Sequence, residues 1–232
     1  TNWNADLKWE YFPNEGELIS ATLFGKLIQN PINSIFINST SNDISYINTG
    51  KQAEVFGLEL EIKKNLFNFN AEDDEYSHKI TGGLNLSMIQ TNQDLDAQKV
   101  TNETDYSANF TFDSSKLTGA SDFLMNADVS YLKEFDEDKS IQATIAYNYF
   151  SDQLNTIGTL NKGNVIDKSY STLDFVLKSK LKQFTFGVSA KNILDPTISR
   201  IQEVYDTPGI NSVVLDEFKR GVNLSLSVGY KF

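Results

Sequence analysis

Carboxylates are the residues of this sequence whose types and spacing come nearest to chemistry. Glu59 and Glu61 are similar to the carboxylate pair of a glycosidase, and Asp94, Asp96 and Asp105 offer the oxygen ligands that calcium prefers. The two glutamates are two residues apart within an alternating segment, so a β-strand explains their spacing without catalysis. The three aspartates lack the spacing of an EF-hand loop. None of these groups predicts a site by itself.

The residue types that build other reactive centres are scarce. His78 is the single histidine, there is no cysteine, and no Gly-x-Ser-x-Gly segment is present to form a nucleophile elbow. Thiolate metal sites, disulfides and histidine-based metal centres therefore lack their ligands. We expect no enzyme, no metal site and no cofactor.

Charge excludes a further class of protein. The formal net charge is −11, whereas nucleic-acid binding needs a basic surface. An acidic cluster, Glu72–Glu75, is expected to be a solvated turn. The sequence therefore predicts no nucleic-acid partner.

A period of two residues is the dominant pattern of the sequence. The closing segment, Gly221–Phe232, sets Val222, Leu224, Leu226, Val228, Tyr230 and Phe232 against Asn223, Ser225, Ser227, Gly229 and Lys231. This alternation predicts a β-strand whose two faces meet different environments. The apolar face would touch either a protein core or a lipid bilayer.

The same alternation recurs along the whole sequence and predicts about nine strands, each near the 9–11 residues that cross a bilayer at a tilt. No segment predicts a helix, and no run approaches the length of a transmembrane helix. The predicted strands cover residues 2–11, 18–27, 54–64, 79–88, 123–131, 140–149, 171–181, 184–192 and 221–232. Residues 105–113 also alternate and are interpreted as a hairpin arm within a long loop.

The predicted connections alternate between short and long. The short connections are residues 13–17, 133–139 and 182–183, with a longer one at 65–77; the long connections are 29–46, 91–122, 151–169 and 193–217. Short turns at one end and long loops at the other are typical of an outer-membrane barrel. Aromatic residues near strand ends agree with interfacial girdles: Trp3, Tyr11, Tyr131, Tyr147, Tyr149 and Tyr230.

The strand count predicts an incomplete barrel. In a meander of nine strands the first and the last run in the same direction, so they cannot pair antiparallel and close a cylinder. Two long edges would stay open, which is an aggregation hazard. We therefore expect residues 1–232 to form the C-terminal portion of one larger β-barrel domain, and we expect the chain to be a processed form or a piece of a longer protein.

Several segments resemble one family in order along the chain. "LKWEYFPNEGELISATLFGKLIQNPI" (Leu7–Ile32), "NTGKQAEVFGLELEIKKNL" (Asn48–Leu66), "KLTGASDFLMNADVSYL" (Lys116–Leu132), "NILDP" (Asn192–Pro196) and the terminal "GYKF" are similar to segments of TonB-dependent outer-membrane receptors, particularly those of Bacteroidetes-type bacteria.

The resemblance implies an all-β, antiparallel, up-and-down transmembrane β-barrel of about 22 strands with a plugged lumen. This chain would then supply roughly strands 14 to 22, and the family's plug domain and TonB box would lie N-terminal to it. The final strand, with Phe232, Tyr230 and Val228, matches the signal that the barrel-assembly machinery recognises in such proteins.

The resemblance implies a receptor in the bacterial outer membrane that imports a scarce solute with energy relayed by TonB. Outer-membrane lipid, TonB through the absent N-terminal region, the barrel-assembly machinery and a surface lipoprotein are the expected partners. Two alternatives remain open: a passive porin or surface scaffold barrel, and a soluble β-sandwich carbohydrate-binding module, because a sandwich also has one apolar face. The solute stays unassigned, and Tyr205 and Phe110 are expected loop contacts.

Overall fold

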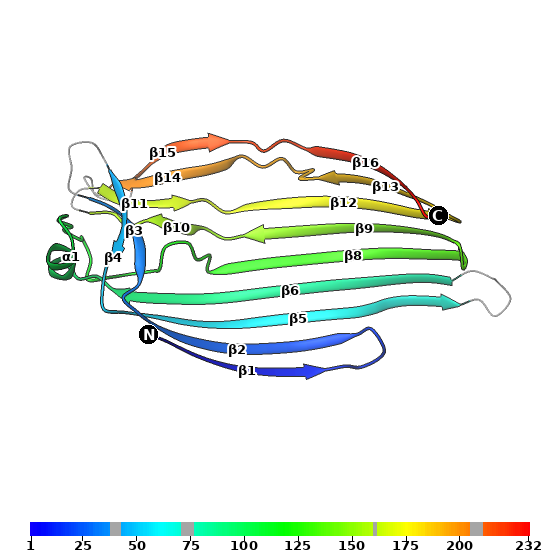
Figure 1. Ribbon diagram of the computed structural model, residues 1–232, viewed down its shortest axis with the longest axis horizontal. Helices are drawn as coiled ribbons and strands as arrows, with labels where there is room; N and C mark the ends of the chain where they lie inside the picture. The colour runs from blue at the N-terminus through cyan, green and yellow to red at the C-terminus, as the bar shows by residue number, and fades with distance from the viewer. Residues whose placement is uncertain (38–42, 71–76, 160–161, 205–210) are drawn as a thin grey trace.

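The computed structural model describes residues 1–37, 43–70, 77–159, 162–204 and 211–232, with the side chain of residue 70 left aside. Within these residues, nine long strands form one antiparallel sheet, and each strand pairs with the next long strand along the chain (Figure 1). The strands are β1 (Asn2–Tyr11), β2 (Leu18–Gln29), β5 (Gln52–Asn70), β6 (Ser77–Asp94), β8 (Phe123–Asp136), β9 (Lys139–Phe150), β12 (Tyr170–Leu181), β13 (Phe184–Lys191) and β16 (Asn223–Tyr230).

All nine predicted strands are confirmed, with changes at their ends. β5 and β6 are the clearest case, because they extend to 19 and 18 residues. The predicted connection 65–77 is therefore mostly strand, and a register shift between Asn65 and Phe67 marks a bulge in it. The turn itself, including Glu72–Glu75, lies outside the described residues.

The register gives the sheet one apolar and one polar face. One apolar row crosses five neighbouring strands through Leu7, Leu23, Leu58, Met88 and Phe123. A polar row on the other face crosses seven strands through Glu10, Ser20, Glu61, Asn85, Asn126, Asn148 and Thr172. Because side chains alternate with a period of two, a slip by one residue at any pair would mix these two faces.

The apolar face of the sheet is exposed rather than packed in a core. Leu224 and Leu226 keep 76% and 77% of their surface accessible, and Trp3, Leu23, Phe56 and Ile145 are also exposed. In a β-sandwich a second sheet would cover such a face, and no described part of the chain does so. The arrangement fits a barrel wall, whose outward residues meet lipid.

The ends of the long strands differ, as the lengths of the connections predict. The ends joined by residues 12–17, 137–138 and 182–183, here called the turn end, carry short links, and the opposite end, the loop end, carries the long segments (Figure 1). The aromatic residues expected at strand ends face the apolar side. Tyr11 pairs with Ile19, Tyr131 with Ile80, and Tyr230 with Phe184 near the turn end.

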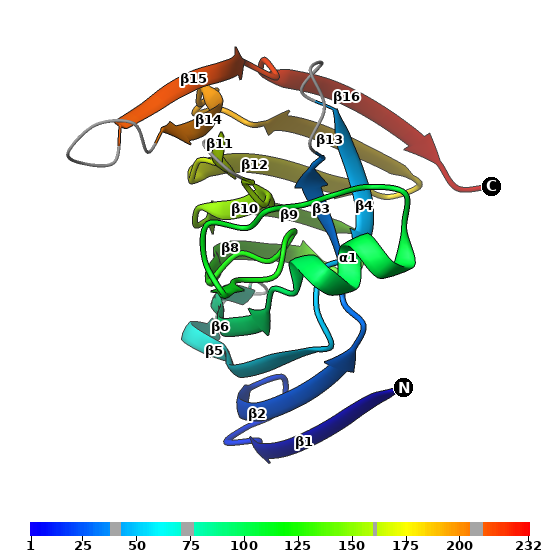
Figure 2. The same cartoon turned by 90° about the vertical axis from the view of Figure 1, so that its left-hand side faces the viewer.

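The sheet is curved and open. Figure 2 shows the strands following one another around an arc, with β1 at one extremity and β16 at the other. Both strands run from the loop end to the turn end (Figure 1). An antiparallel ladder between them is therefore ruled out by direction, as the strand count predicts.

The long connections contain structure that the sequence did not predict. A hairpin joins β3 (Ile32–Phe36) and β4 (Ile44–Asn48), and a second sheet has the order β10-β11-β14-β15. The strands of that sheet are β10 (Gln153–Thr156), β11 (Lys162–Asp167), β14 (Ile198–Val204) and β15 (Asn211–Phe218).

A short helix also occurs, so the prediction of no helix is wrong. Helix α1 (Ala97–Glu103) begins after Asp96, whose carboxylate accepts a hydrogen bond from the Lys99 N–H at 2.9 Å. Such an N-cap satisfies one of the free N–H groups of the first turn. Burial of Val100 provides the tertiary contact that so short a helix needs.

The prediction of a hairpin arm at residues 105–113 is also wrong. The two-residue strand β7 (Ser114–Ser115) pairs with β6 just beyond that segment. The compact core of the molecule lies here at the loop end and consists of Ile35, Ile47, Val100, Ala108 and Ile157, all buried. This core positions the connections over the loop end of the sheet (Figure 2).

Candidate functional site

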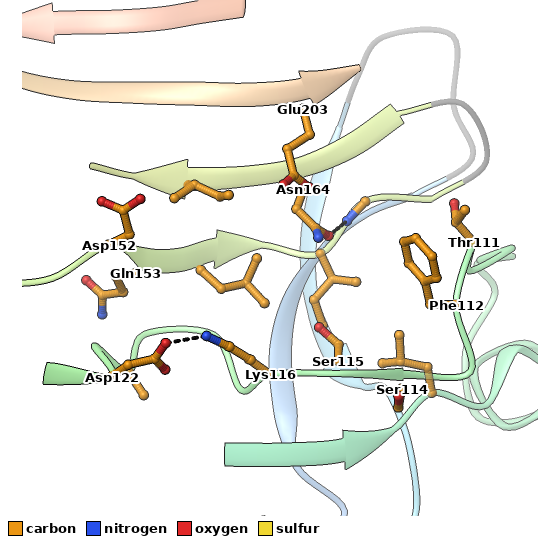
Figure 3. A pocket seen from close by; sticks show the side chains of 16 residues that line it. Thr111, Phe112, Ser114, Ser115, Lys116, Asp122, Asp152, Gln153, Asn164 and Glu203 are labelled. Carbon is orange, nitrogen blue, oxygen red and sulfur yellow. Dashed lines mark hydrogen bonds and ion pairs between the residues drawn. The ribbon is translucent and has the colours of Figure 1, made fainter. Parts of the chain in front are cut away.

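A pocket of about 350 Å³, here called the loop-end pocket, opens among the long connections. Its walls come from residues 111–122, from β10 and β11, and from Glu203 on β14 (Figure 3). The polar side chains that line it include Lys116, Asp122, Asp152, Gln153, Asn164 and Glu203. Phe112, Leu95 and Ile157 give it an apolar portion. A concave, mostly preformed site with a few polar groups is typical of small-molecule binding.

The segment that carries Lys116 is held in place through its backbone. The Lys116 carbonyl accepts a hydrogen bond from Gln93 Nε2 at 2.8 Å, and the Leu117 N–H donates to Thr91 Oγ1 at 3.0 Å. Gly119, at a φ of +82°, makes the turn that follows and donates its N–H to the Leu154 carbonyl at 2.8 Å. These bonds fix the backbone, so the Lys116 side chain reaches Asp122 across the pocket wall (Figure 3).

Behind these bonds lies a polar network with three buried members, Asn33, Thr49 and Gln93. Asn33 Nδ2 donates to Thr49 Oγ1 and to Gln93 Oε1, both at 2.7 Å. Asn33 Oδ1 accepts from the Thr118 N–H and hydroxyl, both at 3.1 Å. These bonds connect the β3–β4 hairpin, β6 and the segment that carries Lys116. Buried polar groups need hydrogen-bond partners, so the three parts are expected to hold their relative positions.

Asp152 on the opposite side of the pocket is ionised and paired. Burial raises the pKa of its carboxyl, but the hydrogen bonds from Lys168 and the Ser169 N–H outweigh burial, and the pKa lies below its ordinary value. The Ser169 N–H donates to Asp152 Oδ1 at 2.7 Å, and Lys168 forms an ion pair with the other oxygen. The carboxylate therefore keeps its charge at neutral pH.

A third ion pair connects two strands of the second sheet. Arg200 donates to Asp167 through Nε at 2.5 Å and through Nη2 at 3.2 Å, a fork that joins β14 to β11. The hydrogen bond to Asp167 raises the pKa of the Arg200 guanidinium. Nearby, Asn164 Oδ1 accepts the Gly158 N–H at 3.0 Å, which sets the orientation of the amide in the pocket.

The groups that line the pocket are of the kinds that bind small molecules. It offers carboxylates, a lysine, amides and hydroxyls beside Phe112 and Ile157, which suits a small polar solute with an apolar part. Among the residues that the structure describes, no group of three or more His, Cys, Asp or Glu side chains could hold a metal ion.

The carboxylates singled out in the sequence do not line the loop-end pocket, and Asp105 is exposed in its connection. Glu59 and Glu61 belong to the polar face of β5, next to Lys8 in a separate hollow of about 230 Å³. Asp94 accepts the N–H groups of Lys51 and Gln52 at 3.0 and 2.9 Å. Asp96 caps α1, so Asp94 and Asp96 both accept hydrogen bonds from backbone N–H groups of the loops.

The remaining residues considered from sequence have the following positions. His78 Nδ1 lies 2.8 Å from the Tyr131 hydroxyl on the apolar face. Phe110 is partly buried and packs against the loop-end core, whereas nearby Phe112 lines the pocket. Tyr205 lies outside the described residues.

Sequence reasoning missed the polar residues of the loop-end pocket. Asp122, Asp152 and Glu203 come from three different connections, and contacts between distant segments bring them together. The available signal was the segment Lys116–Asp122, where a glycine and polar residues precede a strand, a composition typical of a turn.

No helix among the described residues has both the length and the apolar character that crossing a membrane requires.

The sheet is curved and antiparallel, with an exposed apolar face, a polar opposite face and a pocket among its long connections. These features define a class of protein, the wall of a transmembrane β-barrel. Residues 1–193 match the family model described as TonB dependent receptor-like, beta-barrel. The chain belongs to this family, whose members are receptors and transporters of the outer membrane. No curated protein and no solved structure matches the chain.

The match ends at residue 193, before β14, β15 and β16. The geometry nevertheless continues without a break, since all eight residues of β16 pair with all eight of β13. The final strand is therefore part of the same wall.

Proposed function

We propose that the protein is an outer-membrane active-transport receptor that imports a scarce solute and is energised through TonB. The observation that carries the proposal is the register, which collects the apolar residues of nine strands on one exposed face. A bilayer stabilises such a surface, whereas water does not. Family membership supports the receptor role.

The two ends of the sheet then have different surroundings. Barrels of this kind have short periplasmic turns and long extracellular loops, so the turn end faces the periplasm and the loop end faces outward. The loop-end pocket is in the place where a solute would be captured first. Its fixed backbone and paired charges preorganise it for binding.

Residues 1–232 are the C-terminal portion of the barrel domain in this proposal, because both edges of the sheet need partners from outside the nine strands. Phe232, Tyr230 and Val228 form the signal for the barrel-assembly machinery. The Val228 and Tyr230 side chains lie on the outward face of β16, and the exposed Phe232 follows the end of that strand. A surface lipoprotein over the loop end is a further candidate partner, and a Bacteroidetes-type bacterium is the proposed source.

Uptake measured in cells separates active import from a passive pore. A panel of radiolabelled solutes is tested in cells that carry the receptor, with and without TonB and with and without a proton uncoupler. We expect accumulation of one solute class to stop when TonB or the proton gradient is removed. Uptake that continues unchanged would favour the passive porin and contradict the proposal.

The polypeptide and its location are tested separately. The outer-membrane fraction is extracted with detergent, and the mass of the species that contains this segment is measured. We expect a mass several times the 26.1 kDa of this chain. A species of this mass alone in the soluble fraction would contradict the membrane assignment and favour the β-sandwich.

A further inference from the structure

A hollow on the outward apolar face differs from the rest of that face. This hollow, here called the outer groove, has a volume of about 500 Å³ and crosses β5, β6, β8 and β9. Gly82 lies within it, between Ile62 and Leu66 on one side and Val129, Ile145 and Tyr147 on the other.

Two local features make the outer groove. Gly82 adds no side chain to the floor of the hollow, so Leu66 Cδ1 lies 3.2 Å from the position that a Cβ would take there. Leu66 is the extra residue of the β5 bulge, where the register shifts between Asn65 and Phe67. A bulge re-aims side chains locally, so Leu66 closes one side of the groove as a wall.

A cation marks one end of the outer groove. Lys64 lines it and is exposed, and the register places Lys64 opposite Gly82. A second outward-facing lysine, Lys133, lies on β8, opposite His78 of β6 and closer to the turn end. An apolar hollow with lysines at its turn-end side is complementary to an amphiphile that has an acyl chain and an anionic head group.

We propose that the outer groove binds one acyl chain of an anionic phospholipid, with the phosphate beside Lys64. The inference depends on the proposed function, because the turn end must lie at the periplasmic leaflet, where phospholipid head groups are available. The exposed lysine favours a lipid over a second copy of the barrel, since a contact between two copies would bury Lys64.

Native mass spectrometry of the detergent-purified full receptor tests this site. Palmitoyl-oleoyl phosphatidylglycerol is the anionic probe and the phosphatidylcholine with the same chains is the zwitterionic one. We expect the first phosphatidylglycerol to bind more tightly than phosphatidylcholine. Lys64→Gln should weaken that binding about fivefold, the equivalent of about 1 kcal/mol for one lysine near a membrane surface.

Matched variants give the controls. Lys63→Gln makes the same change on the polar face of the same strand, and it should leave lipid binding unchanged. Gly82→Leu fills the groove and should weaken both lipids, whereas Gly25→Leu, at an outward glycine of β2, should not. Lys64→Gln keeps the proposal testable if Gly82→Leu fails to fold.

Equal lipid binding by Lys64→Gln and Lys63→Gln would overturn the proposal. So would a dimeric receptor that Gly82→Leu converts to a monomer without a change in lipid binding, because the groove would then be a contact between copies. Cell fractionation distinguishes the two proposals: a receptor absent from the outer membrane contradicts the proposed function, whereas a receptor present there without Lys64-dependent lipid contradicts this inference alone.

Discussion

Single polar residues hold the loop end together, and Asn33 is the centre of that arrangement. It is 1% exposed, as is its partner Gln93, and its amide bonds Thr49, Gln93 and Thr118. Such a network specifies one structure only while every member keeps its partners. The Asn33 amide therefore links the β3–β4 hairpin to the Lys116 segment, which forms one wall of the loop-end pocket.

Replacing Asn33 with alanine tests that dependence. Asn33→Ala leaves Gln93 and Thr49 buried with fewer partners, at a cost of about 2 kcal/mol. We expect backbone amides in β3, β4 and residues 116–119 to exchange hydrogen with deuterium about thirtyfold faster, which is the ratio that this free energy gives. The measurement is hydrogen–deuterium exchange of the purified receptor.

The exposed Asn223 on β16 supplies the control for Asn33→Ala. Asn223→Ala should leave exchange at the loop end unchanged. Equal exchange in wild type and Asn33→Ala would show that the network does not hold the hairpin.

The charge of Asp152 predicts a dependence on pH. Its pKa in the folded protein lies below the ordinary value of about 4. A depressed carboxyl pKa contributes stability above the ordinary value, and this contribution is lost as the pH falls through the folded pKa. We expect Asp152→Asn to lower the thermal unfolding midpoint at pH 7 and to have no effect once the pH is below the folded pKa.

Thermal unfolding followed by circular dichroism between pH 7 and pH 2.5 measures the effect of Asp152→Asn. Asp105→Asn, at an exposed loop residue, is the matched substitution and should give a small difference at every pH. A difference for Asp152→Asn that grows on acidification would contradict the assigned ion pair with Lys168.

At the scale of the element, each wall strand carries two environments along its whole length. β16 shows this most simply, because Leu224, Leu226 and Val228 face outward while Ser225 and Ser227 face the other way. A charge should therefore have opposite consequences at neighbouring positions. This contrast separates a lipid-facing strand from a strand of a soluble protein.

Leu226→Arg and Ser227→Arg form a matched pair for that comparison. An arginine on the lipid face near the middle of the bilayer costs about 2–4 kcal/mol, whereas Ser227 is exposed on the polar face, opposite Gly187. We expect Leu226→Arg to lower the free energy of unfolding by about that amount in lipid vesicles. Equal effects of the two substitutions would place both faces of β16 in similar surroundings.

The wall strands could be predicted because period two is a local property that each strand repeats by itself. The loop end could not, because its structure depends on contacts between distant segments. Val100 makes α1 stable by packing in the core beside Ile47, and nothing in Ala97–Glu103 alone requires a helix. Residues 105–113 alternate because Ala108 and Phe110 turn towards the core while Phe112 lines the pocket, although no strand pairs with them.

The same limit explains why the candidate site was missed. Asp122, Asp152 and Asn164 belong to separate connections, and their approach is set by bonds such as Gly119 N–H to the Leu154 carbonyl. The alternation of apolar and polar residues carries no information about contacts between distant segments. The barrel wall and the difference between its two ends were therefore predictable, and the pocket required the structure.

At the scale of the whole molecule, the directions of the two edge strands determine what could complete the sheet. β1 and β16 are parallel to one another, so neither can serve as the antiparallel partner of the other. A closed wall with an even number of strands then needs an odd number of additional strands. Those strands would pair both edges and remove the aggregation hazard that open edges create.

Cysteine cross-linking tests this closure directly, and the chain has no cysteine of its own to interfere. Ser189 and Ser225 are register partners with their Oγ atoms 2.6 Å apart, so the pair Ser189→Cys with Ser225→Cys should form a disulfide in the receptor. The pair Asn4→Cys with Ser225→Cys should form none, because in the proposed receptor additional strands separate β1 from β16. A disulfide within one chain between positions 4 and 225, seen as a mobility shift without reductant, would mean that the nine strands close on themselves.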